Sequence, residues 1–519
     1  MLLRVIFGAI RRSVPVLCVF FSHVVDAQMR LSESGHGEVL IFPFYSATPG
    51  EETELTITNH RNHAKAVTLR FREGLAGTEV LGFHVYLAPY DDFTASVVID
   101  AEAGTAAVST SDSSCTVPVL GSPNGNYSGT TTSSGGKVRR VQPFVPYLYL
   151  DDSNSDLGRT FAGSAEVIEL GQWEEGSSIR NEGVFNDIRK SANGDRDGCD
   201  ALNRNWSLGG VWYDNPKASA SNWMGGGLSG KLTVRNQAGE MRISPIVIDG
   251  FARNKTTAEY HQSPGEAEAA WPSASLMNGS RTVLSPANGS LLTARSGLEA
   301  ISILLTKTEV TALAANVEPN AQRGVILSFP TKWHHSTARL GSDALAPFTS
   351  KWDSQTSQAC ELVAVFDQAG PMVTFPYPAD AQTLEVCSAV AVLSAKDAAD
   401  QDSGCQSATF GSPSGCWGFG SNAGSEVDSN LNLPTYADWL GQFVPETGQY
   451  PWRLSFGSSD FMSRSAERWY GSSTQFKGLP AVVMPFAMEW DGGGQQIVLR
   501  GTQRPHIPAF FVQCLLLGW

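Results

Sequence analysis

The chain of 519 residues lacks the short motifs that identify most enzymes and metal proteins. It contains no CxxC pair, which argues against zinc ribbons and thioredoxin-like chemistry. It also has no GxSxG, no HExxH and no phosphate-binding glycine loop, so the common serine hydrolases, zinc proteases and nucleotide-binding enzymes are disfavoured. A catalytic triad built from distant residues needs no local motif and stays open.

Charged residues are also scarce, and those present are unbalanced. They make up 17% of the chain, with 51 acidic against 37 basic residues and a formal charge of −14. So acidic a protein repels polyanions, which excludes nucleic acid as an expected partner. The hydrophobic fraction of 42% is that of a folded protein, and the length predicts several domains rather than one core.

No apolar run near the N-terminus is long enough to span a bilayer, which takes about 20 residues. Residues 14–25 are mostly apolar, follow Arg4, Arg11 and Arg12, and precede small residues around Ala27. This three-part layout predicts a signal peptide over residues 1–27. Its removal takes away three arginines and one aspartate, which changes the formal charge from −14 to −16. We therefore expect an exported protein that is periplasmic, on the outer surface or extracellular, with no transmembrane helix in the mature chain.

Seven cysteines remain after such cleavage, and in an oxidising compartment they are expected to form disulfides. Proximity in the sequence favours Cys405–Cys416 and Cys360–Cys387, which leaves Cys115–Cys199 as a long loop. Cys514 is left over, so its role and that of the apolar C-terminus stay open.

Short runs of alternating apolar and polar residues predict the fold. Residues 28–102 alternate apolar and polar positions in runs separated by turn residues, as in an immunoglobulin-like β-sandwich. The expected inward set is Leu55, Ile57, Val67, Leu69, Phe71, Leu81, Phe83 and Val85. Thr68, between two inward residues, is expected on the opposite face.

The rest of the chain predicts further β-rich domains with long Gly/Ser-rich loops, so the fold class is mainly β. Residues 103–137 are expected to be a Gly/Ser/Thr-rich loop or linker, followed by a β-rich middle domain over 138–296 and a β-rich C-terminal domain over 297–519. Residues 184–206 are expected to be irregular and 209–213 a strand. Helix and strand compete over 297–305, where β-branched residues favour a strand.

Several segments resemble a family of secreted, functionally uncharacterised multidomain proteins from Gram-negative proteobacteria. The resemblance lies in residues 37–45 (GEVLIFPFY), 65–74 (KAVTLRFREG) and 80–91 (VLGFHVYLAPYD), with shorter patches at 115–118, 165–171, 328–332 and 452–456. It implies export and a multidomain fold. It implies no activity and no catalytic residue.

Calcium is the one metal that the sequence favours. Asn193, Asp195 and Asp197 alternate before Gly198, as ligands do at the start of an EF-hand loop. Arg204 stands where that loop needs its bidentate glutamate, which excludes a true EF-hand and leaves a looser calcium site. The alternative is a set of Asx turns held by bonds from side chain to backbone.

Two further residue patterns bear on ligand binding. All 13 tryptophans lie between Trp173 and Trp519, and Trp223 and Trp417 stand in glycine-rich stretches where an exposed ring would bind a ligand such as a glycan. Glu166 and Glu169 are three apart on an expected strand, so they should face opposite sides and should not form a carboxylate pair.

These observations favour a non-enzymatic, exported cell-envelope or extracellular protein that acts by surface binding or assembly. The expected partner is a cell-surface or extracellular protein or glycan. The alternative is a secreted hydrolase whose active site is built from distant residues.

Overall fold

The fold was analysed in a computed structural model of the whole chain. The residues that the structure describes are 28–122, 128–145, 156–176, 179–216, 218, 225–236, 239–251, 261, 276, 279–286, 289, 291–312, 322–336, 347–348, 353, 359–367, 382–395, 441–444, 452–456, 467–470, 474–488 and 497–499. The predicted signal peptide, Cys405, Cys416, Cys514, Trp223 and Trp417 lie outside them.

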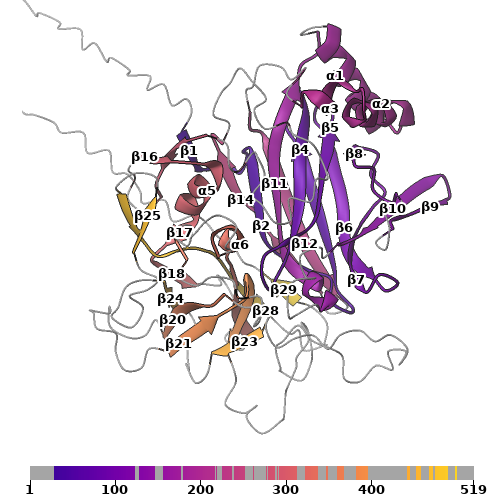
Figure 1. Cartoon of the computed structure of the whole chain (residues 1–519). Helices are drawn as coiled ribbons and strands as arrows, with labels where there is room; N and C mark the ends of the chain where they lie inside the picture. The colour runs from indigo at the N-terminus through magenta and orange to yellow at the C-terminus, as the bar shows by residue number, and fades with distance from the viewer. Residues whose placement is uncertain are drawn as a thin grey trace, which may run out of the picture.

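A nine-stranded sheet forms the centre of the molecule (Figure 1). In spatial order it contains β16 (Leu291–Ala294), β15 (Arg281–Leu284), β1 (Gln28–Leu31), β14 (Ile246–Asp249), β2 (Val39–Ser46), β11 (Ala162–Trp173), β4 (Ala64–Glu73), β5 (Glu79–Leu87) and β8 (Cys115–Val117). Its pairs are antiparallel except β1–β15.

An eight-stranded sheet packs against one face of it. Its order is β29 (Ile497–Leu499), β13 (Gly239–Ile243), β12 (Leu228–Asn236), β3 (Glu52–Asn59), β6 (Asp92–Asp100), β7 (Thr105–Thr110), β10 (Lys137–Pro143) and β9 (Thr130–Ser134). The main hydrophobic core lies between the two sheets, and seven of the eight residues expected to face inward belong to it, with Leu81 packed at its edge. A mainly β fold with a two-sheet core is therefore confirmed.

The other face of the nine-stranded sheet carries three helices at one end: α1 (Ile179–Ala192), α2 (Arg196–Trp206) and α3 (Val211–Asp214). The expectations of an irregular 184–206 and a strand at 209–213 are wrong. Asp195 begins α2 as its N-cap, because its side chain accepts a hydrogen bond from the backbone N–H of Asp197. Among the described residues, no helix is long and apolar enough to cross a membrane.

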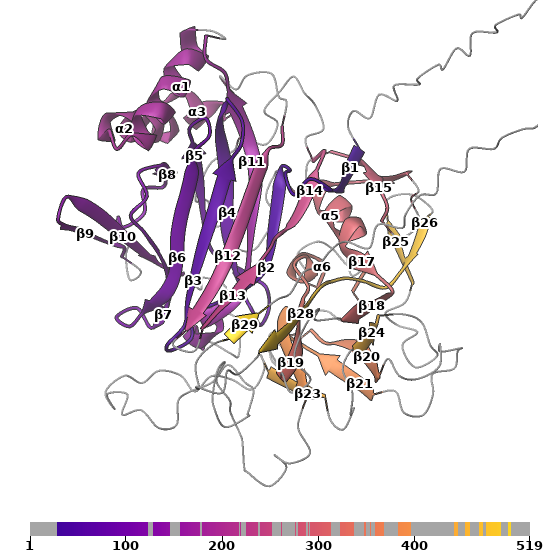
Figure 2. The same ribbon diagram turned by 180° about the vertical axis from the view of Figure 1, so that it is seen from behind.

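The C-terminal part adds smaller sheets beside β2 and β11 (Figure 2). They are β23 (Gly441–Val444), β22 (Val390–Ala395), β19 (Gln322–Ser328) and β28 (Val482–Met488); β18 (Glu309–Ala312), β24 (Trp452–Ser455), β20 (Glu361–Asp367) and β21 (Gln382–Val386); β17 (Thr306–Lys307) with β27 (Leu479–Pro480); and β25 (Glu467–Tyr470) with β26 (Thr474–Lys477).

Two further helices, α5 (Gly297–Leu305) and α6 (Lys332–Ser336), lie in this part. The preference for a strand over 297–305 is wrong, since α5 is a helix. Ser296 caps it by accepting a bond of 3.2 Å from the backbone N–H of Glu299, and the Glu299 carboxylate accepts one from the backbone N–H of Arg295. The sequence signal for this cap is Ser296 followed three residues later by Glu299.

The expected linker over 103–137 is also wrong in part, because it supplies β7, β8 and β9 to the two large sheets. Thr105–Thr110 pairs with both β6 and β10. Strands from 28–102 and 138–296 alternate within the same sheets, as β2 pairs with β11 and β3 with β12. The sandwich therefore does not end near residue 102.

Candidate functional site

The three residues of the predicted calcium loop lie where α1 gives way to α2. The backbone N–H of Asn193 bonds to carbonyls in the last turn of α1, and Asp195 caps α2. The bond from Asp197 N–H to Asp195 Oδ1, 3.0 Å long, is local to this connection. Within the described ranges, no group of three or more His, Cys, Asp or Glu residues is placed to hold a metal ion. The local structure is that of the Asx turn named as the alternative.

Two of the three expected disulfides lie in the described residues, and both are present. Cys115–Cys199 joins β8 to α2, with Cα atoms 5.1 Å apart. Cys360–Cys387 joins the segment before β20 to the segment after β21, with Cα atoms 3.8 Å apart. The third, Cys405–Cys416, stays a prediction.

A group of buried charges lies on the outer face of the nine-stranded sheet, away from the main core. Because Leu69 and Phe71 point into the core, Arg70 and Arg72 of β4 point to the other side. Glu166 of β11 pairs opposite Arg70, and its Oε1 lies 2.9 Å from Arg72 Nη2 and 3.5 Å from Arg70 Nη1. Burial would raise the pKa of Glu166, but Arg72 and Arg70 lower it below its ordinary value.

Glu79 completes this charged group. Gly82 of β5 lies opposite Arg70, and a Cβ there would overlap the Glu79 carboxylate. The missing side chain thus lets Glu79 lie across the strand, with Oε2 3.3 Å from Arg70 Nε. Arg72 also donates from Nη1 to the carbonyl of Gly77, 3.3 Å away. Glu169 faces a different partner, Lys65, so the two glutamates do not form a carboxylate pair, as expected.

Helix α6 meets the sheet beside these arginines. Trp333 of α6 packs on Gly77, the residue that accepts a bond from Arg72. His334 follows it, and burial together with the charges of Arg72, His335 and Arg70 holds the pKa of His334 well below its usual range. We call Arg70, Arg72, Glu166, helix α6 and the neighbouring Ser328 and Ser388 the α6 interface.

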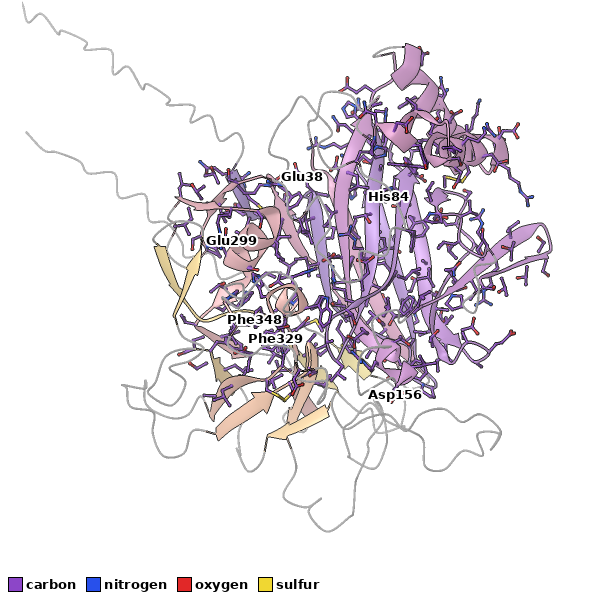
Figure 3. The ribbon with its side chains drawn as sticks, in the orientation of Figure 1. Glu38, His84, Asp156, Glu299, Phe329 and Phe348 are labelled. Atoms are coloured by element: carbon purple, nitrogen blue, oxygen red, sulfur yellow. A yellow bond between two sulfur atoms is a disulfide. The ribbon has the colours of Figure 1, made fainter. Side chains whose placement is uncertain are left out.

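Lys332 anchors the start of α6. Its Nζ donates to the carbonyls of Val386, Cys387 and Ser388 at 3.4, 3.0 and 3.2 Å. Burial lowers the pKa of Lys332 to about 8, with Glu361 acting in the opposite direction. Figure 3 shows Phe329 and Phe348 close together beside α6, and their ring centroids lie 6.0 Å apart.

A serine and a histidine are hydrogen-bonded at the back of this interface. Ser302 Oγ of α5 lies 2.9 Å from His335 Nε2 of α6 and 3.1 Å from Thr331 Oγ1. Ser302 donates its one hydroxyl proton to Thr331, so His335 Nε2 donates to Ser302 and does not act as its base in this conformation. Ser302 also has no exposed surface and stands within a helix, so a substrate cannot reach its hydroxyl in this conformation.

A second polar cluster lies under α1–α3. His261 is enclosed by Tyr86, Trp173, Trp206 and Trp212, with ring centroids 4.7 to 6.4 Å from its own. Trp206 Nε1 can only donate, so Tyr86 Oη accepts from it and donates to His261 Nε2, while His261 Nδ1 donates to the Pro216 carbonyl. Burial lowers the pKa of His261 to about 4. His84, labelled in Figure 3 below these helices, lies between this cluster and Arg70.

Sequence reasoning missed the α6 interface. The signal was present in β4, where charged Arg70 and Arg72 alternate with apolar core residues in a strand. Alternation alone does not show that the second face of this strand is covered as well. Comparisons with models of protein families, with curated proteins and with solved structures found no match for the chain.

Proposed function

We propose that the protein is an exported, non-enzymatic protein that acts by surface binding or assembly, and that it belongs to the secreted family it resembles. The predicted signal peptide over residues 1–27 supports export. The two disulfides add support because such bonds persist in oxidising compartments. A mature N-terminus at Gln28, found by N-terminal sequencing, is the expected result, and intact Met1 on the cellular protein would contradict it.

The observation that carries the binding function is the hairpin of β9 and β10, which we call the arm. The arm extends away from the body of the molecule in Figures 1 and 2. Only Arg140–Pro143 of β10 pair with β7, so the tip around Gly135 projects past the neighbouring strand. All five residues of β9 are exposed, and among the described strands β9 pairs with β10 alone.

The arm is built to accept another strand. A strand at a sheet edge presents unpaired N–H and C=O groups, and proteins usually protect such an edge with lysine, proline or a bulge. β9 consists of Thr130–Ser134 and carries only uncharged Thr and Ser side chains, which have no such protective effect. Its threonines also favour the extended backbone. An extended protein segment can therefore add to this edge.

The charge of the arm indicates the chemistry of that segment. Lys137, Arg139 and Arg140 of β10 stand in a chain of net charge −14. Burial, and after it the charge of Arg196 at the start of α2, lower the pKa of Arg140, while Asp112 acts in the opposite direction. A nucleic acid would be repelled by the whole molecule, whereas a strand with a few carboxylates meets this basic surface directly. The proposed partner is thus an acidic segment of a cell-surface or extracellular protein.

Fractionation of the producing cell tests this function. The variant Lys137→Glu with Arg139→Glu reverses two charges on the arm. Lys190→Glu with Lys231→Glu changes the net charge equally on other exposed positions, in α1 and β12. We expect the wild type and the control to remain with the envelope or surface fraction and the arm variant to be released. Equal fractionation of all three contradicts the proposal, and release of the wild type by glycosidase but not by protease would indicate a glycan partner instead.

The closeness of Ser302 and His335 favours the alternative, a secreted hydrolase, which would need the serine proton to turn from Thr331 to His335. Such an enzyme would need α5 and α6 to separate before a substrate could reach Ser302. A screen of ester, peptide and glycoside substrates against the wild type and Ser302→Ala tests it. Turnover that disappears in Ser302→Ala would establish the hydrolase and overturn the non-enzymatic function.

A further inference from the structure

Four buried polar atoms of the α6 interface lack hydrogen-bond partners among the described residues. They are Ser328 Oγ, His334 Nε2, Ser336 Oγ and Ser388 Oγ, and their residues are 0, 3, 1 and 1% exposed. Native proteins leave few such groups, since a buried polar atom without a partner costs about as much as a lost hydrogen bond. Their concentration around one short helix therefore indicates a missing polar partner.

Hydrogen bonds place Ser328 and Ser388 beside each other and beside α6. Ser328 pairs with Val390 in the sheet, and the next residue, Phe329, donates its backbone N–H to the carbonyl of Ala389. Ser388 is held against α6 because its carbonyl accepts a bond from Lys332 Nζ. The backbone N–H groups of Ala389 and Val390 in turn bond to the carbonyls of Leu75 and Gly74, in the turn that follows Arg72.

Positive charges act on His334, and carboxylates lie against these cations, Glu79 of β5 against Arg70 among them. Arg72 and Arg70 come from β4, and both act to lower the pKa of His334, as does His335 on α6. Glu166 of β11 lies against the two arginines, and Lys332 on α6 faces Glu361 of β20. Hydroxyl and imidazole groups beside guanidinium groups are the donors that proteins use to bind oxyanions.

We propose that the α6 interface binds a small oxyanion, a carboxylate or a phosphate-like group, with His334 Nε2 and the hydroxyls of Ser328 and Ser388 donating hydrogen bonds and Arg72 supplying charge. This site is separate from the arm and does not depend on the function proposed for it. A bound anion favours the charged form of His334, so binding takes up a proton and tightens as the pH falls. The tightening can reach about tenfold per pH unit between the pKa values of His334 in the free and bound states.

Isothermal titration of the full chain with sulfate and with acetate tests the site, with chloride at equal ionic strength as the reference. Sulfate represents phosphate-like groups and keeps its charge between about pH 5.5 and about pH 7.5, across the ordinary pKa of histidine. Acetate represents carboxylates. The exposed-histidine control, His60→Gln, should bind as the wild type does. We expect at least one oxyanion to bind the wild type and to bind more tightly at the lower pH.

Two changes at His334 separate binding from folding. His334→Gln keeps a neutral donor, so it should bind sulfate with an affinity that no longer changes with pH. His334→Phe removes the donor and should abolish binding. Binding no stronger than that of chloride, or equal binding by His334→Phe, would overturn the proposal. If His334→Phe does not fold, His334→Gln still tests the proposal. A sulfate affinity of His334→Gln that still depends on pH would overturn it.

Discussion

Lys65 Nζ donates to Glu169 Oε1 inside the nine-stranded sheet, where neither side chain has exposed surface. The second carboxylate oxygen of Glu169 accepts a bond of 3.0 Å from the backbone N–H of Gly226. This ion pair therefore ties β4 to β11 and to the segment that leads into β12.

Removal of one partner should be far more costly than removal of both. Lys65→Met leaves a buried carboxylate without its counterion and should lower the free energy of unfolding by about 3–5 kcal/mol. Lys65→Met combined with Glu169→Leu should recover most of that loss. Denaturant unfolding measures both, and a double variant no more stable than Lys65→Met would contradict the interpretation.

An exposed pair provides the control. Arg235 and Glu54 on the eight-stranded sheet lie 2.9 Å apart, with side chains 48 and 30% exposed. Because water screens such a pair, Arg235→Met should change the free energy of unfolding by less than about 1 kcal/mol.

The Cys115–Cys199 disulfide should hold the helical end of the molecule to the sheet. It closes a loop with a sequence separation of 84. In the chain-entropy model a loop of this length contributes about 4.5 kcal/mol. Cys115→Ser with Cys199→Ser should therefore lower the unfolding free energy and speed hydrogen exchange in α1 and α2 more than in β19 and β22. Equal exchange in these regions would contradict a local role.

Non-reducing peptide mapping tests the whole disulfide pattern. The expected peptides contain Cys115–Cys199, Cys360–Cys387 and Cys405–Cys416, with Cys514 unpaired. A peptide that joins Cys514 to another cysteine of the chain would require at least one pairing to be reassigned.

His261 should make the folded state sensitive to acid. Burial lowers its pKa from 6.5 to about 4, so between these values the unfolded chain binds a proton that the folded chain does not. The stability that His261 contributes is present above about pH 6.5 and is lost as the pH falls toward about 4, by roughly 3 kcal/mol. Denaturant unfolding across this range should show a shallower loss for His261→Gln. An equally steep loss in the variant would show that other groups, such as His84 and His334, dominate.

The sandwich could be predicted because apolar and polar residues alternate along its core strands. Leu69 and Phe71 face the core as expected. Thr68 lies between these two inward residues and is expected on the opposite face, and it is only 2% exposed. Alternation identifies the two faces of a strand but does not say what covers the second one. Here α1–α3, α5 and α6 cover that side, and their positions depend on contacts far apart in the sequence.

Local signals explain the remaining differences. Ser296 followed three residues later by Glu299 is a sequence signal for a helix start, but the β-branched residues of this segment favour a strand. Asp195 and Asp197 carry oxygens that suit a metal or a helix start equally well. The structure shows Asp195 as the N-cap of α2, and the calcium site stays a prediction. The α6 interface joins β4, β11, α6 and the residues before β22, so no single segment reveals it.

Cross-linking from the arm tests the proposed function most directly. A photoreactive residue at Ser133, in β9, should form adducts in producing cells with an acidic, extended segment of an envelope or extracellular protein. The same residue at Lys231, exposed on β12, should not. The Ser133 adduct should disappear when Lys137→Glu and Arg139→Glu are added. No adduct from Ser133, the same adduct from Lys231, or an adduct that survives the charge reversal would contradict binding through the arm.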